Sequence, residues 1–236
     1  AYDYVLSIGK TPIVVNDSRG FFTSRVFGTF VMEGAAMLAE GIPAPMIEQA
    51  GIAAGMPVGP LAVLDETSLS LSVHVLDQTR ADFAAQGQTY APSRGELFTE
   101  NMVKALNRPG RAGGGGYYDY PAGAKKQLWS GLKQFEKPLT GEPQVMLQEL
   151  KDRLLYRQAI ETARCMAENV LTSTHDANIG SIFAIGFPAW TGGAMQFIYS
   201  EGVERFTQRS AELAERYGTG FALTDAVKAV IEKHRP

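Results

Sequence analysis

From Asp17 onward, hydrophobic residues recur at steps of three and four along the chain, the spacing of one face of an α-helix. The first such run ends before Gly41, and Asp17 or Ser18 is expected to cap its start by accepting hydrogen bonds from free backbone N–H groups. The pattern therefore predicts one long helix between these residues. Its apolar face consists of Phe22, Val26, Phe30 and Ala36, together with Val31 and Met37.

The same spacing predicts further helices later in the chain. They are expected over residues 45–54, 61–85, 96–106 and 147–169. The loop Met56-Pro57-Val58-Gly59-Pro60 separates two of them and is stiff, because each proline fixes its own φ angle. The run from Gly110 to Gly116 is rich in glycine, and we expect it to be a flexible joint between the two halves of the chain.

The two halves are similar to one another. When the chain is shifted by 128 positions, five identities fall within sixteen aligned positions. Further on, Gly55-Met56-Pro57 corresponds to Gly186-Phe187-Pro188. A fixed offset with matching turns indicates a duplication, and we expect the two copies to form one intimate pair rather than two independent domains. The aligned identities are Arg25 with Arg153, Glu33 with Glu161, Ala35 with Ala163, Ala39 with Ala167 and Glu40 with Glu168.

The predicted domain organisation follows from this duplication. It consists of a first helical unit over 16–120, a linker over 121–146 and a second helical unit over 147–236. Because the same Arg and Glu recur eight residues apart in both copies, Arg25 is expected to be structural.

The first residues indicate that the chain continues a domain that lies upstream. It opens without an initiator Met, a signal peptide or a basic transit segment. A helix end closed by Gly9 is followed by a short β-branched strand over 12–15, and no later segment is a convincing partner for that strand. Residues 1–15 are therefore expected to be the tail of a missing α/β domain. The alternative interpretation is a processed N-terminus.

Composition and charge exclude several classes of protein. With 45% hydrophobic and 20% charged residues, the chain is typical of a folded protein. The net charge is −3 without a basic block, so no nucleic-acid partner is expected. The longest apolar stretch, from Phe21 to Leu38, is interrupted by Arg25 and Glu33, so no membrane span is expected either.

Candidate chemistry is sparse. The three histidines lie far apart without cysteine or carboxylate at metal-ligand spacing, so no metal site is expected. Cys165 lies on an apolar helix face, where a small buried hydrophobic residue is more common than a nucleophile. Neither glycine-rich signature of a nucleotide-binding loop occurs in the chain, and no cofactor is expected to bind to it.

Several motifs taken together closely resemble the C-terminal region of 3-hydroxyacyl-CoA dehydrogenases. The second half looks like the second unit of the fused multifunctional fatty-acid oxidation enzymes. The resemblance implies a mainly α fold of duplicated helical-bundle units, similar to the C-terminal domain of 6-phosphogluconate dehydrogenase, with a short remnant strand at the N-terminus. The matching segments are Gly9 to Arg25, Gly55 to Pro60, Leu64-Asp65, Gly115 to Tyr120, Gly186 to Pro188 and Gly192-Gly193.

In this family an N-terminal Rossmann domain holds NAD and a catalytic His–Glu pair, and the helical part closes over acyl-CoA and mediates dimerisation. The resemblance therefore implies the C-terminal part of an NAD-dependent L-3-hydroxyacyl-CoA dehydrogenase of fatty-acid β-oxidation, homodimeric, cytoplasmic and inactive when alone. NAD would be bound by the missing domain. Two alternatives are a non-catalytic helical assembly module with the same fold, and another dehydrogenase that acts on smaller hydroxy acids, whose motifs fit less well.

The resemblance also implies candidate site residues. Ser24 occupies the position where the family commonly has an Asn close to the reacting hydroxyl, and a serine hydroxyl still donates and accepts hydrogen bonds. The alternative is that Ser24 is a simple helix-face residue and that the glycines and prolines only shape turns. The residues expected to bind substrate are Gly20, Phe21, Met56, Pro57 and Gly59.

Overall fold

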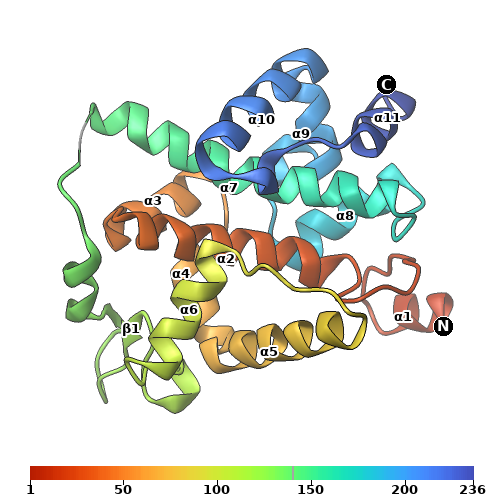
Figure 1. Ribbon diagram of the computed structural model, residues 1–236. Helices are drawn as coiled ribbons and strands as arrows, with labels where there is room; N and C mark the ends of the chain where they lie inside the picture. Colours follow the sequence, from red (N-terminus) through yellow and green to blue (C-terminus); the bar gives the residue numbers. More distant parts are fainter. Residues whose placement is uncertain (140) are drawn as a thin grey trace. The chain divides into compact units, whose positions relative to one another are not determined.

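A computed structural model describes residues 1–139 and 141–236, and its fold is mainly α-helical (Figure 1), which confirms the predicted fold class. A small antiparallel sheet pairs strand β1 (Tyr118–Asp119) with β2 (Gln127–Leu128). The α-helices are α1 (Tyr2–Ser7), α2 (Thr23–Glu40), α3 (Ala44–Ala54), α4 (Pro60–Thr67), α5 (Leu69–Ala85), α6 (Arg94–Lys104), α7 (Pro143–Ala167), α8 (Thr174–Ile185), α9 (Ala194–Glu201), α10 (Val203–Tyr217) and α11 (Asp225–Lys233). The 3-10 helices are η1 (Arg111–Gly113), η2 (Ser130–Phe135), η3 (Ala189–Thr191) and η4 (Thr219–Phe221).

The chain divides into two compact units that each join distant segments. Unit 1 consists of residues 1–30, 54–56 and 152–236, and unit 2 consists of residues 31–53 and 57–151. Helices α2 and α7 contribute residues to both units. The predicted division into copies over 16–120 and 147–236 describes the repeat rather than these units, and it stays a prediction.

Unit 1 is built around the C-terminal part of α7. Tyr156 of α7 stacks on Phe206 of α10, with ring centroids 4.6 Å apart, and meets Phe197 of α9 edge-on at 5.5 Å. These aromatic side chains are buried because α10 places its apolar residues at helical spacing, from Val203 through Phe206 to Leu213. Helix α9 packs against both α8 and α10, so the four helices share one core.

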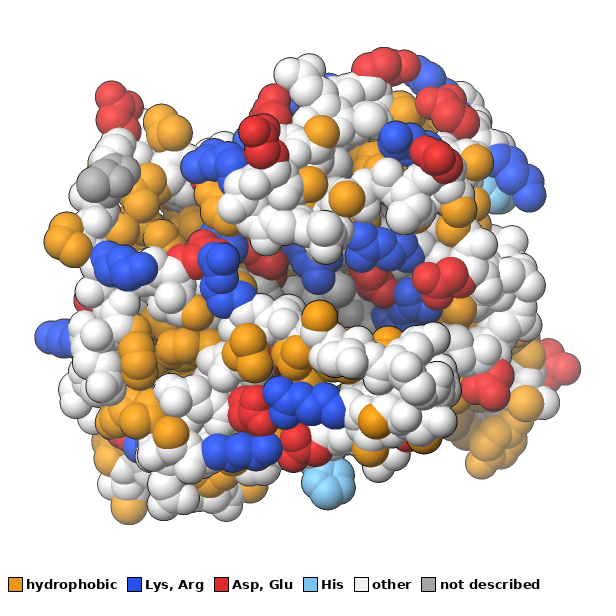
Figure 2. Space-filling model, viewed as in Figure 1, with side chains coloured by type: hydrophobic (Ala, Val, Ile, Leu, Met, Phe, Trp, Pro, Cys, Tyr) orange, Lys and Arg blue, Asp and Glu red, His pale blue; other side chains and the backbone are white. Residues whose placement is uncertain are grey.

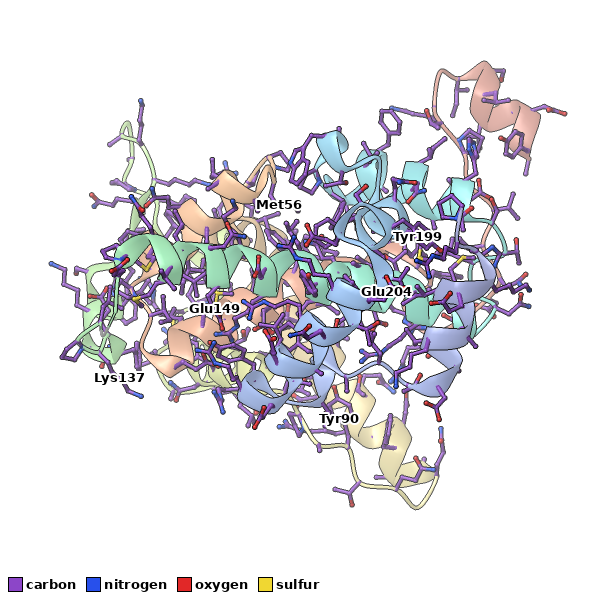
Figure 3. All side chains as sticks on the ribbon, turned by 90° about the horizontal axis from the view of Figure 1, so that it is seen from above. Met56, Tyr90, Lys137, Glu149, Tyr199 and Glu204 are labelled. Atoms are coloured by element: carbon purple, nitrogen blue, oxygen red, sulfur yellow. The ribbon has the colours of Figure 1, made fainter. Side chains whose placement is uncertain are left out.

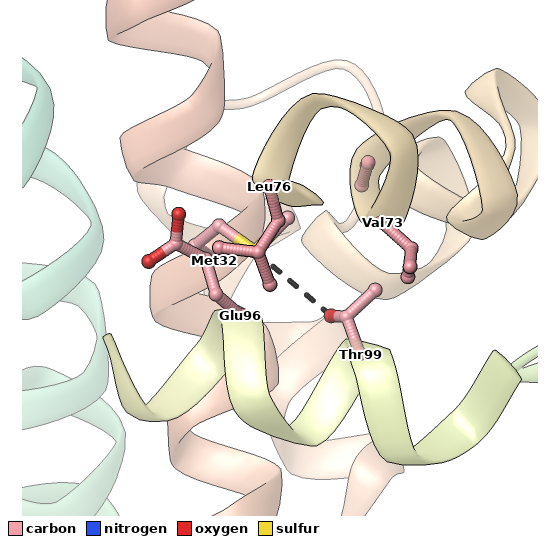
Figure 4. Close-up of a pocket in the computed structure, with 6 residues that line it drawn as sticks. Met32, Val73, Leu76, Glu96 and Thr99 are labelled. Carbon is pink, nitrogen blue, oxygen red and sulfur yellow. Dashed lines mark hydrogen bonds between the residues drawn. The ribbon is translucent and has the colours of Figure 1, made fainter. Parts of the chain in front are cut away.

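In unit 2, helices α5 and α6 pack against each other. Ser93 and Glu96 form a capping box at the start of α6, in which each side chain accepts a hydrogen bond from the backbone N–H of the other. Between the helices, Thr99 Oγ1 donates to Met32 Sδ at 3.9 Å (Figure 4). The space left there for a water molecule is about 0 Å³, so this gap is packed core and not a ligand site. Its lining residues are Met32, Ser72, Val73, Leu76, Glu96 and Thr99.

Helix α2 begins later than predicted. It starts at Thr23, so the expectation that Asp17 or Ser18 caps it is wrong. The reason lies in the preceding turn, where the N–H of Phe21 donates to the carbonyl of Ser18 at 3.0 Å. Gly20 and Phe21 both have positive φ angles, which a helix does not accommodate.

The single helix predicted over 61–85 is two helices. Ser68 has a φ angle of 94°, which ends α4 at Thr67. Its hydroxyl then accepts a hydrogen bond from the N–H of Leu71 at 3.3 Å and so caps α5. The hydrophobic spacing continues across this break, and the sequence pattern therefore gave no sign of it.

The glycine run from Gly110 to Gly116 is folded into a turn, so its description as a flexible joint is wrong. Gly110 and Gly115 exchange two backbone hydrogen bonds of 3.0 Å each. Residues 121–146, predicted to be a linker, include β2, η2 and the start of α7. In that segment Leu132 is buried, and the N–H of Trp129 donates to the carbonyl of Tyr117 at 2.9 Å.

The N-terminal residues agree in part with the sequence pattern. Helix α1 ends shortly before Gly9, whose φ angle is 73°, as expected of a C-terminal glycine. Residues 12–15 are not in either strand of the described sheet, so the remnant strand is not formed there. Ile13 and Val15 instead pack against the core of unit 1, and the N–H of Asn16 donates to the carbonyl of Val170 at 2.8 Å.

Candidate functional site

Three of the predicted site residues lie together at the start of α2. Gly20 and Phe21 have φ angles of 74° and 47°, and Ser24 follows in the first turn of the helix. A methyl group at Gly20 would lie 3.8 Å from Cβ of Ser24. The two residues that follow Gly20 in this group are open to solvent: Ser24 is exposed, and the Phe21 side chain is 51% exposed.

The conformation of Phe21 is unusual. A left-handed φ angle in a residue with a bulky side chain costs about 1–3 kcal/mol, which the surrounding structure must offset. The structure therefore places a strained aromatic residue and an exposed hydroxyl side by side. Such a hydroxyl can donate a hydrogen bond to a bound molecule and can also accept one from it.

Arg25, next to Ser24, is held by two carboxylates, that of Glu161 in α7 and that of Glu168 directly after this helix. Its guanidinium lies 2.7 Å from Glu161 Oε1 and 2.5 Å from Glu168 Oε2. Burial opposes the charge of Arg25, but the hydrogen bond that it donates to Glu168 and the negative charge of Glu161 leave its pKa raised. The arginine therefore joins the start of α2 to α7, and the ion pair connects residues that the alignment assigns to different copies.

Met56 is buried in unit 1, where Figure 3 labels it. Its sulfur accepts a hydrogen bond from Gln158 Nε2 at 3.7 Å, and the same amide nitrogen donates to the carbonyl of Leu154 at 3.0 Å. Gln158 Oε1 is buried without a hydrogen-bond partner in the described structure. The preceding Gly55 has a φ angle of 99°, and Trp190 Nε1 donates to the carbonyl of Ala54 at 3.3 Å.

Pro57 and Gly59 belong to unit 2, where Pro57 is exposed and Gly59 is buried. Gly59 has an ordinary extended conformation, with φ −67° and ψ 155°. Its glycine identity has another cause, because a Cβ there would lie 2.5 Å from the carboxyl carbon of Glu48. Gly59 is therefore a close packing contact of Glu48.

The carboxylate of Glu48 connects three parts of unit 2. Its Oε1 accepts from the N–H of Leu61 at 2.8 Å and from that of Ala62 at 3.4 Å, both at the start of α4. Its Oε2 accepts from the hydroxyl of Tyr118 at 2.7 Å. Because Glu48 lies in α3, these bonds join α3 to α4 and to β1.

Asp65, on the next helix α4, also joins two parts of unit 2 through hydrogen bonds to its carboxylate. It is fully buried and accepts hydrogen bonds from the N–H of Tyr117 at 2.6 Å, the N–H of Tyr118 at 3.2 Å and the hydroxyl of Tyr120 at 2.8 Å. A Cβ on Gly116 would lie 1.8 Å from Asp65 Oδ1, so only glycine fits there. The glycine-rich turn is thereby fixed on α4.

Burial raises the pKa of Glu48 and of Asp65, although the hydrogen bonds of Tyr118 and Tyr120 work in the opposite direction. The same burial raises the pKa of the hydroxyl groups of Tyr118 and Tyr120. Each carboxylate accepts three hydrogen bonds within the protein. This arrangement stabilises a fold and does not present a carboxylate to a substrate.

The remaining candidate chemistry is accounted for by packing. Cys165 is buried in the core of unit 1, and burial raises the pKa of its thiol to about 12, so it is not an activated nucleophile. Within residues 1–139 and 141–236, no cluster of histidine, cysteine and carboxylate side chains suits a metal ion. No helix in the described part of the chain is long and apolar enough to cross a membrane. Acidic and basic side chains lie interspersed on the face shown in Figure 2.

The structure thus brings Gly20, Phe21 and Ser24 together and places Gly59 against Glu48. The roles of the predicted site residues stay predictions. Sequence reasoning missed Glu48 altogether and gave Asp65 no role. No signal in the sequence marked them, because the N–H groups that they accept from lie 13 and 52 positions further along the chain and reach them only in the folded structure.

Part of the chain matches a known family. Residues 20–120 match the family model described as 3-hydroxyacyl-CoA dehydrogenase, C-terminal domain. This segment contains Ser24, the Met56–Pro60 loop and the acids Glu48 and Asp65.

Similar proteins extend the match to nearly the whole chain. The fatty acid oxidation complex subunit alpha of Vibrio cholerae is 31% identical over 219 residues, which is 93% of this chain and 30% of that protein. The subunit alpha of Shewanella loihica is 30% identical over 228 residues, 95% of this chain and 31% of that protein. The chain therefore spans about a third of the length of these relatives.

A solved structure shows the same fold. The dehydrogenase part of multifunctional enzyme 1 from C. elegans superposes with a TM-score of 0.67 at 20% identity, over 97% of this chain and 52% of that one. The resemblance seen in the sequence motifs is confirmed: residues 20–120 match the C-terminal domain of 3-hydroxyacyl-CoA dehydrogenases, and nearly the whole chain is similar to part of the fatty acid oxidation complex subunits alpha.

Proposed function

We propose that this chain is the C-terminal, substrate-closing and dimerising part of an NAD-dependent L-3-hydroxyacyl-CoA dehydrogenase of fatty-acid β-oxidation. The observation that carries the proposal is the match of residues 20–120 to the C-terminal domain of that family. The relatives named as fatty acid oxidation complex subunits support the pathway. The single buried Cys165 fits a cytoplasmic, reducing environment.

The start of α2 is the part of the chain proposed to meet the reacting end of the acyl group. Ser24 presents an exposed hydroxyl, and Phe21 presents an exposed aromatic ring beside it. The ring offers apolar surface to an acyl chain, and the hydroxyl offers a hydrogen bond to the 3-hydroxyl of the substrate.

The residues present do not fit NAD. The sequence lacks the glycine pattern of a dinucleotide-binding loop, and the described residues form a two-stranded antiparallel sheet where such a loop needs a parallel one. We therefore assign NAD to a domain outside this chain. The 236-residue chain alone should not oxidise 3-hydroxyacyl-CoA.

The proposal is tested with the native polypeptide that carries this chain, by measuring NAD reduction in the presence of 3-hydroxyacyl-CoA. Replacing Ser24 by alanine should lower kcat/KM at least about tenfold, because the lost hydrogen bond is made to the reacting substrate. The free energy of unfolding should change by less than about 0.5 kcal/mol, because the side chain is exposed.

Ser200→Ala is the matched control, since Ser200 is also an exposed serine on a helix. It should leave the rate unchanged. An unchanged rate in Ser24→Ala would make Ser24 a helix-face residue. A native polypeptide without any dehydrogenase activity would favour the non-catalytic assembly module instead.

A further inference from the structure

The same hydrogen-bonding arrangement occurs once in each compact unit. In unit 2, Glu48 Oε1 accepts from the first N–H groups of α4, at Leu61 and Ala62. In unit 1, Asn178 Oδ1 accepts from two N–H groups in the first turn of α9, at Met195 and Gln196, both at 3.0 Å, while the first N–H, that of Ala194, donates to Ser181 Oγ. Each acceptor lies on the helix before the turn, so each fixes the place where the turn ends.

A glycine packs against the acceptor in both units. A Cβ on Gly59 would lie 2.5 Å from the carboxyl carbon of Glu48, and a Cβ on Gly193 would lie 2.5 Å from Cα of Asn178. The two turns differ in length and sequence but begin alike, with Gly55-Met56-Pro57 and Gly186-Phe187-Pro188. The shared part is therefore the acceptor, the glycine and the helix start.

Unit 2 adds a bond that unit 1 does not share. The second oxygen of Glu48 accepts from the hydroxyl of Tyr118 at 2.7 Å. Lys126 lies near this pair, with its Nζ 5.1 Å from the centre of the Tyr118 ring and 2.6 Å from Glu66 Oε1. Asn178 has a single oxygen, which its two backbone bonds already use. Glu48 thus links its turn to β1 as well as to α4.

We propose that Glu48 is a positioning residue, which holds Pro57, Val58 and Gly59 in the conformation that contacts the acyl chain, with Tyr118 holding Glu48 in turn. This inference rests on the proposed function and on the predicted substrate-binding role of Pro57 and Gly59. Prolines at positions 57 and 60 fix only their own φ angles, and Gly59 has an ordinary conformation that imposes no strain. The carboxylate supplies the restraint that the backbone lacks.

Loss of this restraint should act on substrate binding rather than on the chemical step. A loop that samples several conformations loses conformational entropy when substrate binds, and this loss weakens the affinity for the substrate. The Michaelis constant for 3-hydroxyacyl-CoA should then rise while kcat changes little. A residue that only stabilised the fold would lower the amount of active protein and leave KM unchanged.

The experiment compares Glu48→Ala and Glu48→Gln in the native polypeptide. Glu48→Ala should raise KM about tenfold and speed amide hydrogen exchange at Leu61 by at least about tenfold, because hydrogen bonds to a charged group are lost. Glu48→Gln keeps one oxygen for the N–H groups of Leu61 and Ala62, as Asn178 does at α9, so amide exchange at Leu61 should stay near the wild type. It loses the acceptor of the Tyr118 hydroxyl, so its KM should rise only about threefold. Gln49→Ala, which shortens an exposed side chain of the same helix α3, is the control and should change neither.

A second pair of variants avoids any loss of folding in Glu48→Ala. Tyr118→Phe removes only the hydroxyl that donates to Glu48 and should raise KM about threefold. Tyr117→Phe is its matched control, because the buried Tyr117 hydroxyl bonds to Thr99 Oγ1 at 3.1 Å and not to Glu48. It should leave KM unchanged.

The outcomes separate this inference from the proposed function. An active wild type whose KM is unchanged in Glu48→Ala and Tyr118→Phe overturns the positioning role and leaves the proposed function intact. A KM that rises equally in Tyr117→Phe overturns it too, since general loosening would then explain the effect. A wild-type polypeptide without dehydrogenase activity overturns both.

Discussion

Glu48 and Asp65 each accept three hydrogen bonds, yet the pKa of each is raised because burial disfavours the charged form. A carboxyl group with a raised pKa binds its proton more tightly in the folded state than in the unfolded state. Its contribution to stability is therefore fully present below the unfolded pKa and is lost as pH rises through the folded pKa.

This sign gives the first prediction. Glu48→Gln removes the titrating group, so the variant should gain stability relative to wild type as pH rises from about 4.3, the ordinary pKa of Glu, through the raised pKa of the folded protein. Urea unfolding of both proteins at several pH values from acid to neutral measures the difference. A variant whose free energy of unfolding falls relative to the wild type as the pH rises would contradict the prediction. It would show that the hydrogen bonds to Glu48 lower its pKa by more than burial raises it.

Gln158 provides a second prediction at the scale of one residue. Its Oε1 is buried without a partner in the described structure, and such an oxygen costs about 1–3 kcal/mol. Gln158→Leu replaces the amide by an apolar group of similar size and should be neutral or raise the free energy of unfolding by up to about 1 kcal/mol. Thermal unfolding checks this, with Thr162→Val as a control that removes a buried hydroxyl already bonded to the carbonyl of Gln158. A fall of several degrees in Gln158→Leu would show that the oxygen has a partner in solution.

Residues at the predicted site illustrate what the sequence discloses at this scale. Ser24 could be singled out because it stands in a motif, and the structure gives it the exposure that a site residue needs. Glu48 could not, since thirteen residues separate it from Leu61, and a bond over that distance is invisible until the turn is folded. The strain at Phe21 is equally hidden, because a non-glycine residue with a positive φ angle carries no sequence signature.

Elements were predicted well where one helical face is continuously apolar. Helices α3, α6 and α7 agree with their predicted ranges within a few residues. Errors occurred where a single residue interrupts a continuing pattern, as Ser68 does between α4 and α5. The glycine turn was misjudged for a different reason: its order comes from Asp65, a residue on another element.

Two glycines of helix α2 allow a prediction at the scale of this element. Nothing lies within 4 Å of a Cβ built on Gly28, whereas a Cβ on Gly34 would lie 2.6 Å from Cβ of Pro60. Gly28→Ala should therefore stabilise the protein by about 0.5–1 kcal/mol, because alanine loses less backbone entropy in a helix. Gly34→Ala should destabilise it by about 1–3 kcal/mol through overpacking.

The two variants control for each other, since both replace a glycine by alanine in one helix. Equilibrium unfolding in urea compares them directly. Equal effects of the two substitutions would contradict the prediction, because they would show that helix propensity alone decides the outcome and that the contact with Pro60 relaxes without cost.

At the scale of the whole molecule, the sequence predicts the helical class and the duplication, and the structure adds how the chain is shared between units. Segments 1–30 and 152–236 fold into one unit although more than a hundred residues separate them. The alignment by 128 positions compares copies but contains no information about which segments pack together. The boundaries of a sequence repeat therefore need not coincide with the boundaries of a compact unit.

The proposal that NAD binds to a domain outside this chain is tested on the 236-residue chain itself. Saturating NAD should leave its unfolding temperature unchanged, because a ligand raises that temperature only when it binds the folded state. Thermal unfolding with and without NAD measures this, and the native polypeptide carrying the chain is the positive control. A rise that grows with NAD concentration would place a dinucleotide site in this chain.

The close contact between each turn glycine and its acceptor also limits how the two copies can change over evolutionary time. A side chain at position 59 conflicts with the carboxyl end of Glu48, so a shorter residue at 48 would make room for alanine at 59, and the two positions should vary jointly. At position 193 the conflict is with the backbone of residue 178, which no substitution there relieves, and φ is 113° as well. The first copy is thus free to exchange its glycine through a paired replacement, whereas the second copy has to keep its own.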